Sequence, residues 1–253
     1  MAARTLPTER ERRVTVMLVP YMSCGAKLPI YTLFASCFFH GTGGAMIGAV
    51  YVLGVFAAAV AAAVLRRAYP PDSEAEYILE MPPWRLPTAK NILRALYFRA
   101  GEFLSRAFGI RFLSSVAVWA LSTFDLSFYV TYDGDRSILA FIGRLIAPVF
   151  EPLGFGDWRA AAALISGLSA KEAVIGTLSV LAGAGGIGSI FTKASSLSFL
   201  AFTLLYTPCA SAIAAMRGEL GSKKAMFASL CAGLVLAWCV AFAVYHAACA
   251  LGI

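Results

Sequence analysis

Long apolar blocks, separated by short charged segments, constrain this chain more than any other feature. The clearest block runs from Gly41 to Leu65 without a charged residue, is rich in alanine and glycine, and ends at Arg66 and Arg67. A membrane-spanning helix needs about 20 mostly apolar residues. Of the 253 residues, 60% are hydrophobic and 14% charged, which is more apolar than a soluble domain of this length needs. The chain is therefore predicted to be a multi-pass membrane protein.

Six such blocks predict an all-α fold, a polytopic membrane helical bundle of about six membrane segments with broken or re-entrant helices. The blocks are Val14–Phe39, Gly41–Leu65, Ile110–Phe124, Trp158–Leu181, Leu197–Met216 and Ala225–Leu251. A shorter apolar stretch, Ile138–Phe150, carries Arg144 and ends among prolines. It is predicted to be interfacial or re-entrant, because it is too short to span the hydrocarbon core.

A basic amphipathic helix is predicted to begin after Thr88, a residue type that suits a helix N-cap. Apolar residues follow at helical spacing, with lysine and arginine between them, a pattern typical of a helix on the membrane surface. The apolar positions are Ile92, Leu93, Leu96, Phe103 and Leu104. Just before this helix, Met81–Pro87 is predicted to be an extended strap fixed by its prolines.

The net charge of +7 is carried by residues between the apolar blocks. This placement fits cytoplasmic loops and anionic lipid head groups, so no nucleic-acid partner is expected. The positive-inside rule places the basic N-terminus, residues 1–13, and the loop Arg66–Arg106 in the cytoplasm. The acidic segment Asp125–Asp157 is then expected outside.

Simple alternation from that point puts Arg217, Lys223 and Lys224 outside as well, which the positive-inside rule disfavours. One later segment is therefore predicted to be a re-entrant hairpin rather than a span. The block that contains Lys171 and Glu172 is the favoured candidate, because it carries charges near its middle.

The first apolar block is broken by residues 19–29, which hold two prolines, a glycine, a thiol and a lysine. Proline removes a backbone donor and ends a helix. In hydrocarbon, freed backbone groups are tolerated only where they face protein or a water-filled cavity. This predicts a polar site at membrane depth, with Ser23 and Cys24 as candidate ligands and with Pro20 and Gly25 supporting the break.

Two later blocks are interrupted in a similar way. Lys171 and Glu172 form an acid–base pair inside an apolar block, where a charge costs on the order of 3 kcal/mol, so a functional role is favoured over a purely structural pair. Pro208 is expected to kink its helix and to free a carbonyl one turn earlier. Thr207 and Cys209 lie beside that kink and are further candidate ligands.

The six cysteines all lie in apolar blocks, and there is no Cys-x-x-Cys motif and only two histidines. A disulfide framework and a zinc site built from neighbouring residues are therefore not expected. Thiols combined with a carboxylate and hydroxyls suit a borderline first-row divalent metal. This favours a transition-metal permease, although composition and helix breaks alone fit an organic solute carrier equally well.

The sequence contains no convincing nucleotide-binding motif. No G-x-x-x-x-G-K-[ST] motif is present, so no P-loop is expected and the chain is not predicted to be an enzyme. Gly183–Gly188 formally matches G-x-G-x-x-G, but it follows a predicted membrane helix and lacks the later acidic residue. It is interpreted as a connection.

Six stretches occur in the order Met17–Pro29, Leu79–Pro87, Arg99–Leu104, Pro152–Arg159, Ala170–Val174 and Tyr206–Cys209. Together they resemble the C-terminal membrane region of the ferrous iron transport protein B (FeoB) family. The resemblance covers nearly the whole chain from Val14 onward. It implies a membrane core with a cytoplasmic loop over residues 14–99 and a second gate-type, nucleoside-recognition-like membrane repeat over residues 100–253.

The resemblance also implies a function. Members of the family import Fe(II) across the bacterial inner membrane, and cysteines have been proposed to line the iron path. Cys24 and Cys209 match that pattern by motif, with Ser23, Thr207 and Glu172 as possible oxygen ligands and Lys171 as a charge partner of Glu172. Fe(II) is then the transported ion, and no permanently bound cofactor is expected.

The family's GTPase domain and first gate repeat have no counterpart in this sequence. The expected partners are therefore the lipid bilayer, Fe(II), and a GTPase-bearing complementary chain or small Feo accessory proteins, with homo-oligomerisation left open. A non-transporting interaction or regulatory membrane subunit, and a gate-type carrier of nucleoside-like solutes, remain the alternatives to a permease portion.

Overall fold

The computed structural model describes residues 6, 8–68, 86–125, 127, 129–130, 134–206 and 208–252. Within these ranges every extended regular element is a helix, and the only β structure is two isolated bridges, Phe124 with Val130 and Asp125 with Ser137. The predicted all-α class is confirmed. Most of the predicted strap, Met81–Pro87, lies outside the described residues.

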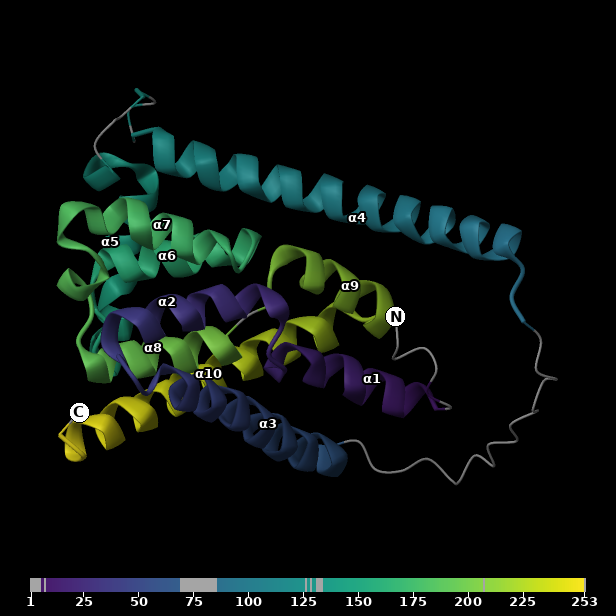
Figure 1. Ribbon diagram of the computed structural model, residues 1–253, viewed down its shortest axis with the longest axis horizontal. Helices are drawn as coiled ribbons and strands as arrows, with labels where there is room; N and C mark the ends of the chain where they lie inside the picture. The colour runs from purple at the N-terminus through teal and green to yellow at the C-terminus, as the bar shows by residue number, and fades with distance from the viewer. Residues whose placement is uncertain are drawn as a thin grey trace.

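The α-helices form a bundle (Figure 1). They are α1 (Glu9–Leu18), α2 (Leu28–Phe38), α3 (Gly43–Ala68), α4 (Ala89–Thr123), α5 (Ile138–Phe150), α6 (Trp158–Ser169), α7 (Ala173–Ala182), α8 (Lys193–Leu205), α9 (Ala210–Leu220) and α10 (Lys223–Ala250). Single 3₁₀ turns join or extend them: η2 (Val19–Tyr21), η3 (Gly25–Lys27), η4 (Gly134–Arg136), η5 (Glu151–Leu153), η6 (Gly183–Gly185) and η7 (Ile187–Ser189).

Three helical runs of the described residues are long and apolar enough to cross a membrane: α3, α10 and the consecutive pair α8 and α9. A fourth candidate is the pair α5 and α6, which bends by 105° and is either a broken span or a re-entrant loop. The apolar blocks are thus helical as predicted, and length and composition support three of them as spans, or four with the bent pair.

The predicted interruptions are confirmed. Residues 19–27 separate α1 from α2, residues 170–172 separate α6 from α7, and residues 206–209 separate α8 from α9. Because α6 and α7 also pack against each other, the chain turns back at its charged break. That packing agrees with the hairpin expected around Lys171 and Glu172.

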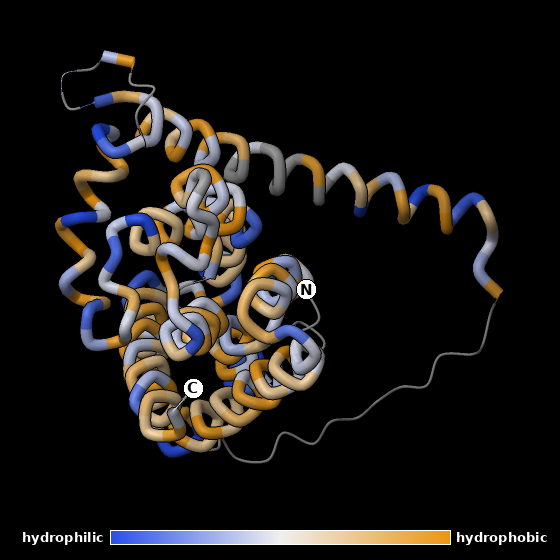
Figure 2. The backbone as a smooth tube through the Cα atoms, turned by 60° about the vertical axis from the view of Figure 1, so that its left-hand side comes forward, coloured by the Kyte–Doolittle hydropathy of each residue, from blue (hydrophilic) through white to orange (hydrophobic). Residues whose placement is uncertain are grey.

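Helix α4 differs from expectation. The amphipathic helix and the third apolar block were predicted as two elements, but Ala89–Thr123 is one continuous helix of 35 residues. The boundary was wrong because the residues between the two, 107–109, include no proline. Gly109 is the weakest helix former among them, and a glycine inside a helix costs only about 1 kcal/mol. Thr88 is the N-cap residue as predicted, although its side chain makes no capping hydrogen bond. Hydrophilic and hydrophobic residues alternate along the free end of α4 (Figure 2).

The basic termini of several helices gather at one end of the bundle. Val16 of α1 and Met216 of α9 belong to one small apolar cluster, against which the end of α3 and the start of α10 pack. At the same end, a terminal nitrogen of Arg10 donates to the backbone carbonyl of Arg66, at 3.3 Å. Arg217, Lys223 and Lys224 therefore lie on the side of Arg66, as the positive-inside rule requires. In Figure 1 this is the right-hand end of α1, α3 and α10.

Helix α8 forms the centre of the core. Its residues are almost all buried, and its phenylalanines contact those of neighbouring segments. Between ring centroids, Phe199 lies 5.4 Å from Phe34 of α2, on which it stacks, and 5.4 Å from Phe155, which it meets edge to face. The hydroxyl of Ser198 donates to the carbonyl of Ala241 in α10, at 3.0 Å. These contacts fix the end of α8, and with it the break that follows.

Candidate functional site

A buried lysine joins the first helix break (residues 19–27) to the third (residues 206–209); the second break is residues 170–172. Lys27, only 3% exposed, donates from Nζ to the carbonyl of Leu204 at 2.7 Å and to that of Met22 at 3.2 Å. In a continuous helix the Leu204 carbonyl would accept from the N–H of residue 208, but residue 208 is a proline and has none. Lys27 therefore supplies the donor that Pro208 removes. Lys27, in the first break, thus binds the carbonyl that Pro208 was predicted to free.

The second break is joined to the third through an aromatic ring. Lys171, also 3% exposed, places Nζ 3.1 Å from the centroid of the Tyr206 ring, the geometry of a cation–π contact. The hydroxyl of Tyr206 donates to the carbonyl of Leu164 in α6, at 3.2 Å. The three interrupted helices thus meet at one place inside the bundle.

Both predicted thiols belong to this meeting point. Cys24 immediately precedes η3 and is exposed, whereas Cys209 immediately precedes α9, is half-buried, and lies 3.1 Å from the hydroxyl of Ser211. Beside Cys24, the hydroxyl of Ser23 is hydrogen-bonded to that of Tyr31, at 3.3 Å.

The remaining predicted site residues are placed differently. Glu172 is exposed at the start of α7, and its pairing with Lys171 stays a prediction. Thr207 lies outside the described residues. Pro20 lies in η2 and Gly25 in η3, so both shape the first break. The described residues contain no cluster of three or more histidine, cysteine, aspartate or glutamate side chains suited to a metal ion. A ligand set here would combine two thiols with hydroxyl or carbonyl oxygens.

Two residues that hold the site together were not among the predicted site residues. Lys27 and Tyr206 connect the breaks. In the sequence each is only one residue of a local motif, and nothing beside it indicates a contact with a distant helix. The usable signal for Lys27 was its charge inside an apolar block, since an intramembrane lysine needs a partner. Nothing in the sequence identified that partner, because Leu204 lies 177 residues away.

Comparisons with known proteins agree with this architecture. Residues 47–99 match the family model described as ferrous iron transport protein B C terminus, and residues 104–223 match a gate model described as nucleoside recognition. An Fe(2+) transporter FeoB of Methanocaldococcus jannaschii is 36% identical over 96% of this chain. The chain belongs to the FeoB family. It corresponds to the C-terminal membrane region of that family.

Other FeoB relatives extend the comparison. An Fe(2+) transporter FeoB of Staphylococcus aureus is 34% identical over 97% of the chain. A protein of Porphyromonas gingivalis, described as a fusion of Fe(2+) transport protein A with FeoB, is 26% identical over 97% of the chain. The chain spans 38% of the length of the first two relatives and 35% of the third. No solved structure matches the chain significantly.

Proposed function

We propose that this chain forms the membrane permease portion of a ferrous iron uptake transporter in the bacterial inner membrane. The observation that carries the proposal is the convergence of three helix breaks, two of which contain Cys24 and Cys209. The names of the FeoB relatives support Fe(II) as the transported ion. A GTPase-bearing partner and small Feo accessory proteins belong to the same proposal, and the fused relative favours the accessory proteins.

The chemistry of the meeting point suits passage better than permanent binding. Thiolates prefer soft and borderline metals, and oxygen donors can complete the coordination of Fe(II). A transport path must bind the ion well enough to admit it and weakly enough to release it. Two thiols at helix breaks, with no cluster of three or more histidine, cysteine, aspartate or glutamate side chains among the described residues, suit such transient binding.

Serine substitution of the thiols tests the proposal. We expect the double variant Cys24→Ser and Cys209→Ser to lower Fe(II) uptake by at least about tenfold, the size of loss typical when a metal site is perturbed. Uptake is measured as cell-associated ⁵⁵Fe in an iron-uptake-deficient strain that expresses this chain with the complementary GTPase-bearing half. The matched control is Cys37→Ser with Cys239→Ser, since both thiols are exposed on α2 and α10, away from the breaks. Unchanged uptake at equal membrane levels would contradict the ligand assignment.

A carrier of nucleoside-like solutes is the second candidate, because the gate match is described as nucleoside recognition. In that case the same break would bind a polar organic solute through hydroxyls and carbonyls. Reconstituted vesicles that take up radiolabelled uridine, with no competition from Fe(II), would favour the carrier. Fe(II) uptake by the same vesicles, without uptake of uridine, would favour the iron path.

A further inference from the structure

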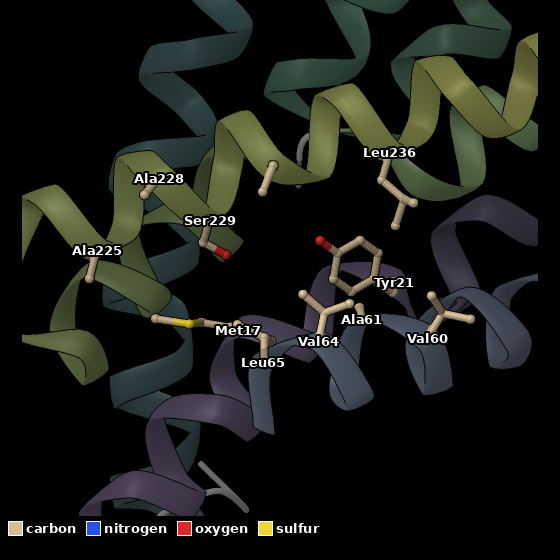
Figure 3. Close-up of a pocket in the computed structure, with 11 residues that line it drawn as sticks. Met17, Tyr21, Val60, Ala61, Val64, Leu65, Ala225, Ala228, Ser229 and Leu236 are labelled. Carbon is tan, nitrogen blue, oxygen red and sulfur yellow. The ribbon is translucent and has the colours of Figure 1, made fainter. Parts of the chain in front are cut away.

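An apolar cleft lies between α1, α3 and α10, and Tyr21 of the first break lines it (Figure 3). Its volume is about 340 Å³. The lining is almost entirely aliphatic, and among the lining residues only Tyr21 and Ser229 carry hydroxyls. In Figure 3 both hydroxyls point into the space between α10 and the facing helices.

The cleft has the length of one lipid leaflet. Along α10 its lining extends from Ala225 to Leu236. At 1.5 Å per residue this interval is about 16 Å. Half of a hydrocarbon core that is about 30 Å thick is about 15 Å. The cleft therefore matches one extended acyl chain within a single leaflet.

Positive charge surrounds one end of the cleft. The lining residues Leu65 and Ala225 mark that end, and basic residues adjoin both of them in sequence. The adjoining residues are Arg66, Arg67, Lys223 and Lys224. From α1, Arg10 reaches the carbonyl of Arg66, while the Nε atoms of Arg10 and Arg12 are buried and make no hydrogen bond among the described residues.

We propose that this cleft binds one anionic phospholipid, with an acyl chain between α3 and α10 and the phosphate among Arg10, Arg66 and Lys224. Basic pockets between membrane helices on the cytoplasmic side are suited to anionic head groups. Arg66 and Lys224 are exposed, so their side chains can donate to an anionic phosphate. A zwitterionic lipid offers no net charge to balance the basic rim, so the charge of the site selects the anionic class.

The test measures lipid retention by the whole chain. Purified protein is mixed with equimolar phosphatidylglycerol and phosphatidylcholine in detergent micelles, and bound lipid is counted by native mass spectrometry. We expect one phosphatidylglycerol to be retained preferentially. Arg66→Gln with Arg67→Gln should weaken its binding at least about tenfold, since each basic residue near a membrane surface contributes about fivefold. The matched control is Lys90→Gln with Arg94→Gln, two exposed charges on α4 that do not line the cleft.

A second pair of variants tests the acyl chain separately. Ala232→Trp fills the cleft from α10 and should abolish retention, whereas Val235→Trp, on the exposed side of the same helix, should leave it unchanged. Equal retention of phosphatidylcholine, or retention that survives Ala232→Trp, would overturn the proposal. A dimer that persists in phosphatidylglycerol and is lost with Ala232→Trp would overturn it too, because a second copy would then occupy the cleft. None of these measurements depends on iron uptake.

Discussion

Replacing Lys27 with methionine is expected to lower the free energy of unfolding by about 2–4 kcal/mol. The variant leaves the buried carbonyl of Leu204 and the part-buried carbonyl of Met22 without the donor that now serves both. An unsatisfied buried carbonyl costs about 1–3 kcal/mol. Methionine is easier to bury than an ammonium group, which offsets part of that loss. Unfolding in mixed micelles, followed by circular dichroism, measures the change.

The control for this variant is Lys90→Met, because Lys90 is exposed on α4 and its loss should change stability by less than about 0.5 kcal/mol. Pro208→Ala provides a sharper test, since alanine restores the N–H that bonds to the Leu204 carbonyl in a continuous helix. In that background Lys27→Met should cost about 1–2 kcal/mol less than in the parent chain, a coupling of the size expected for residues in contact. A Lys27→Met protein as stable as the parent would show that burying the ammonium outweighs its hydrogen bonds.

Where the helices break could be predicted from sequence, because the causes are local. Pro20, Pro208 and the charged pair at residues 171–172 each interrupt an apolar block, and the structure ends a helix near each of them. Proline acts on the carbonyl four residues earlier, so even the freed Leu204 carbonyl followed from the position of Pro208. The boundary predicted between the amphipathic helix and the apolar block from Ile110 was wrong, because no strong helix breaker lies there and α4 continues through it.

The meeting of these breaks could not be predicted in the same way. Lys27 and Leu204 are 177 residues apart, and Tyr206 and Leu164 are 42 apart. Such contacts depend on how the helices pack around α8, and hydrophobic periodicity within one helix carries no information about that packing. The ligand roles of Cys24, Cys209, Ser23, Thr207 and Glu172 therefore stay predictions from motif and chemistry.

Replacing Gly167 with alanine is expected to cost about 2–3 kcal/mol and to disturb the meeting point directly. Gly167 is buried in α6, and a Cβ there would crowd Val174 and the hydroxyl of Tyr206. Overpacking of this kind typically costs about 1–3 kcal/mol. To make room, Tyr206 would have to give up its hydrogen bond to Leu164 and shift its ring away from Lys171. The expected readout is lower stability together with lower Fe(II) uptake.

Two further variants separate this steric cause from a general effect of alanine. Gly176→Ala, in α7, meets nothing within 4 Å and should stabilise the protein by about 0.5–1 kcal/mol, as glycine is a poor helix former. Tyr206→Phe alone should cost about 0.5–1.5 kcal/mol for its hydrogen bond. Combined with Gly167→Ala it should cost less than the sum, because removing the hydroxyl makes space for the new methyl group. Strictly additive costs would contradict the close approach of α6 to the third break, since only groups in contact couple by 0.5 kcal/mol or more.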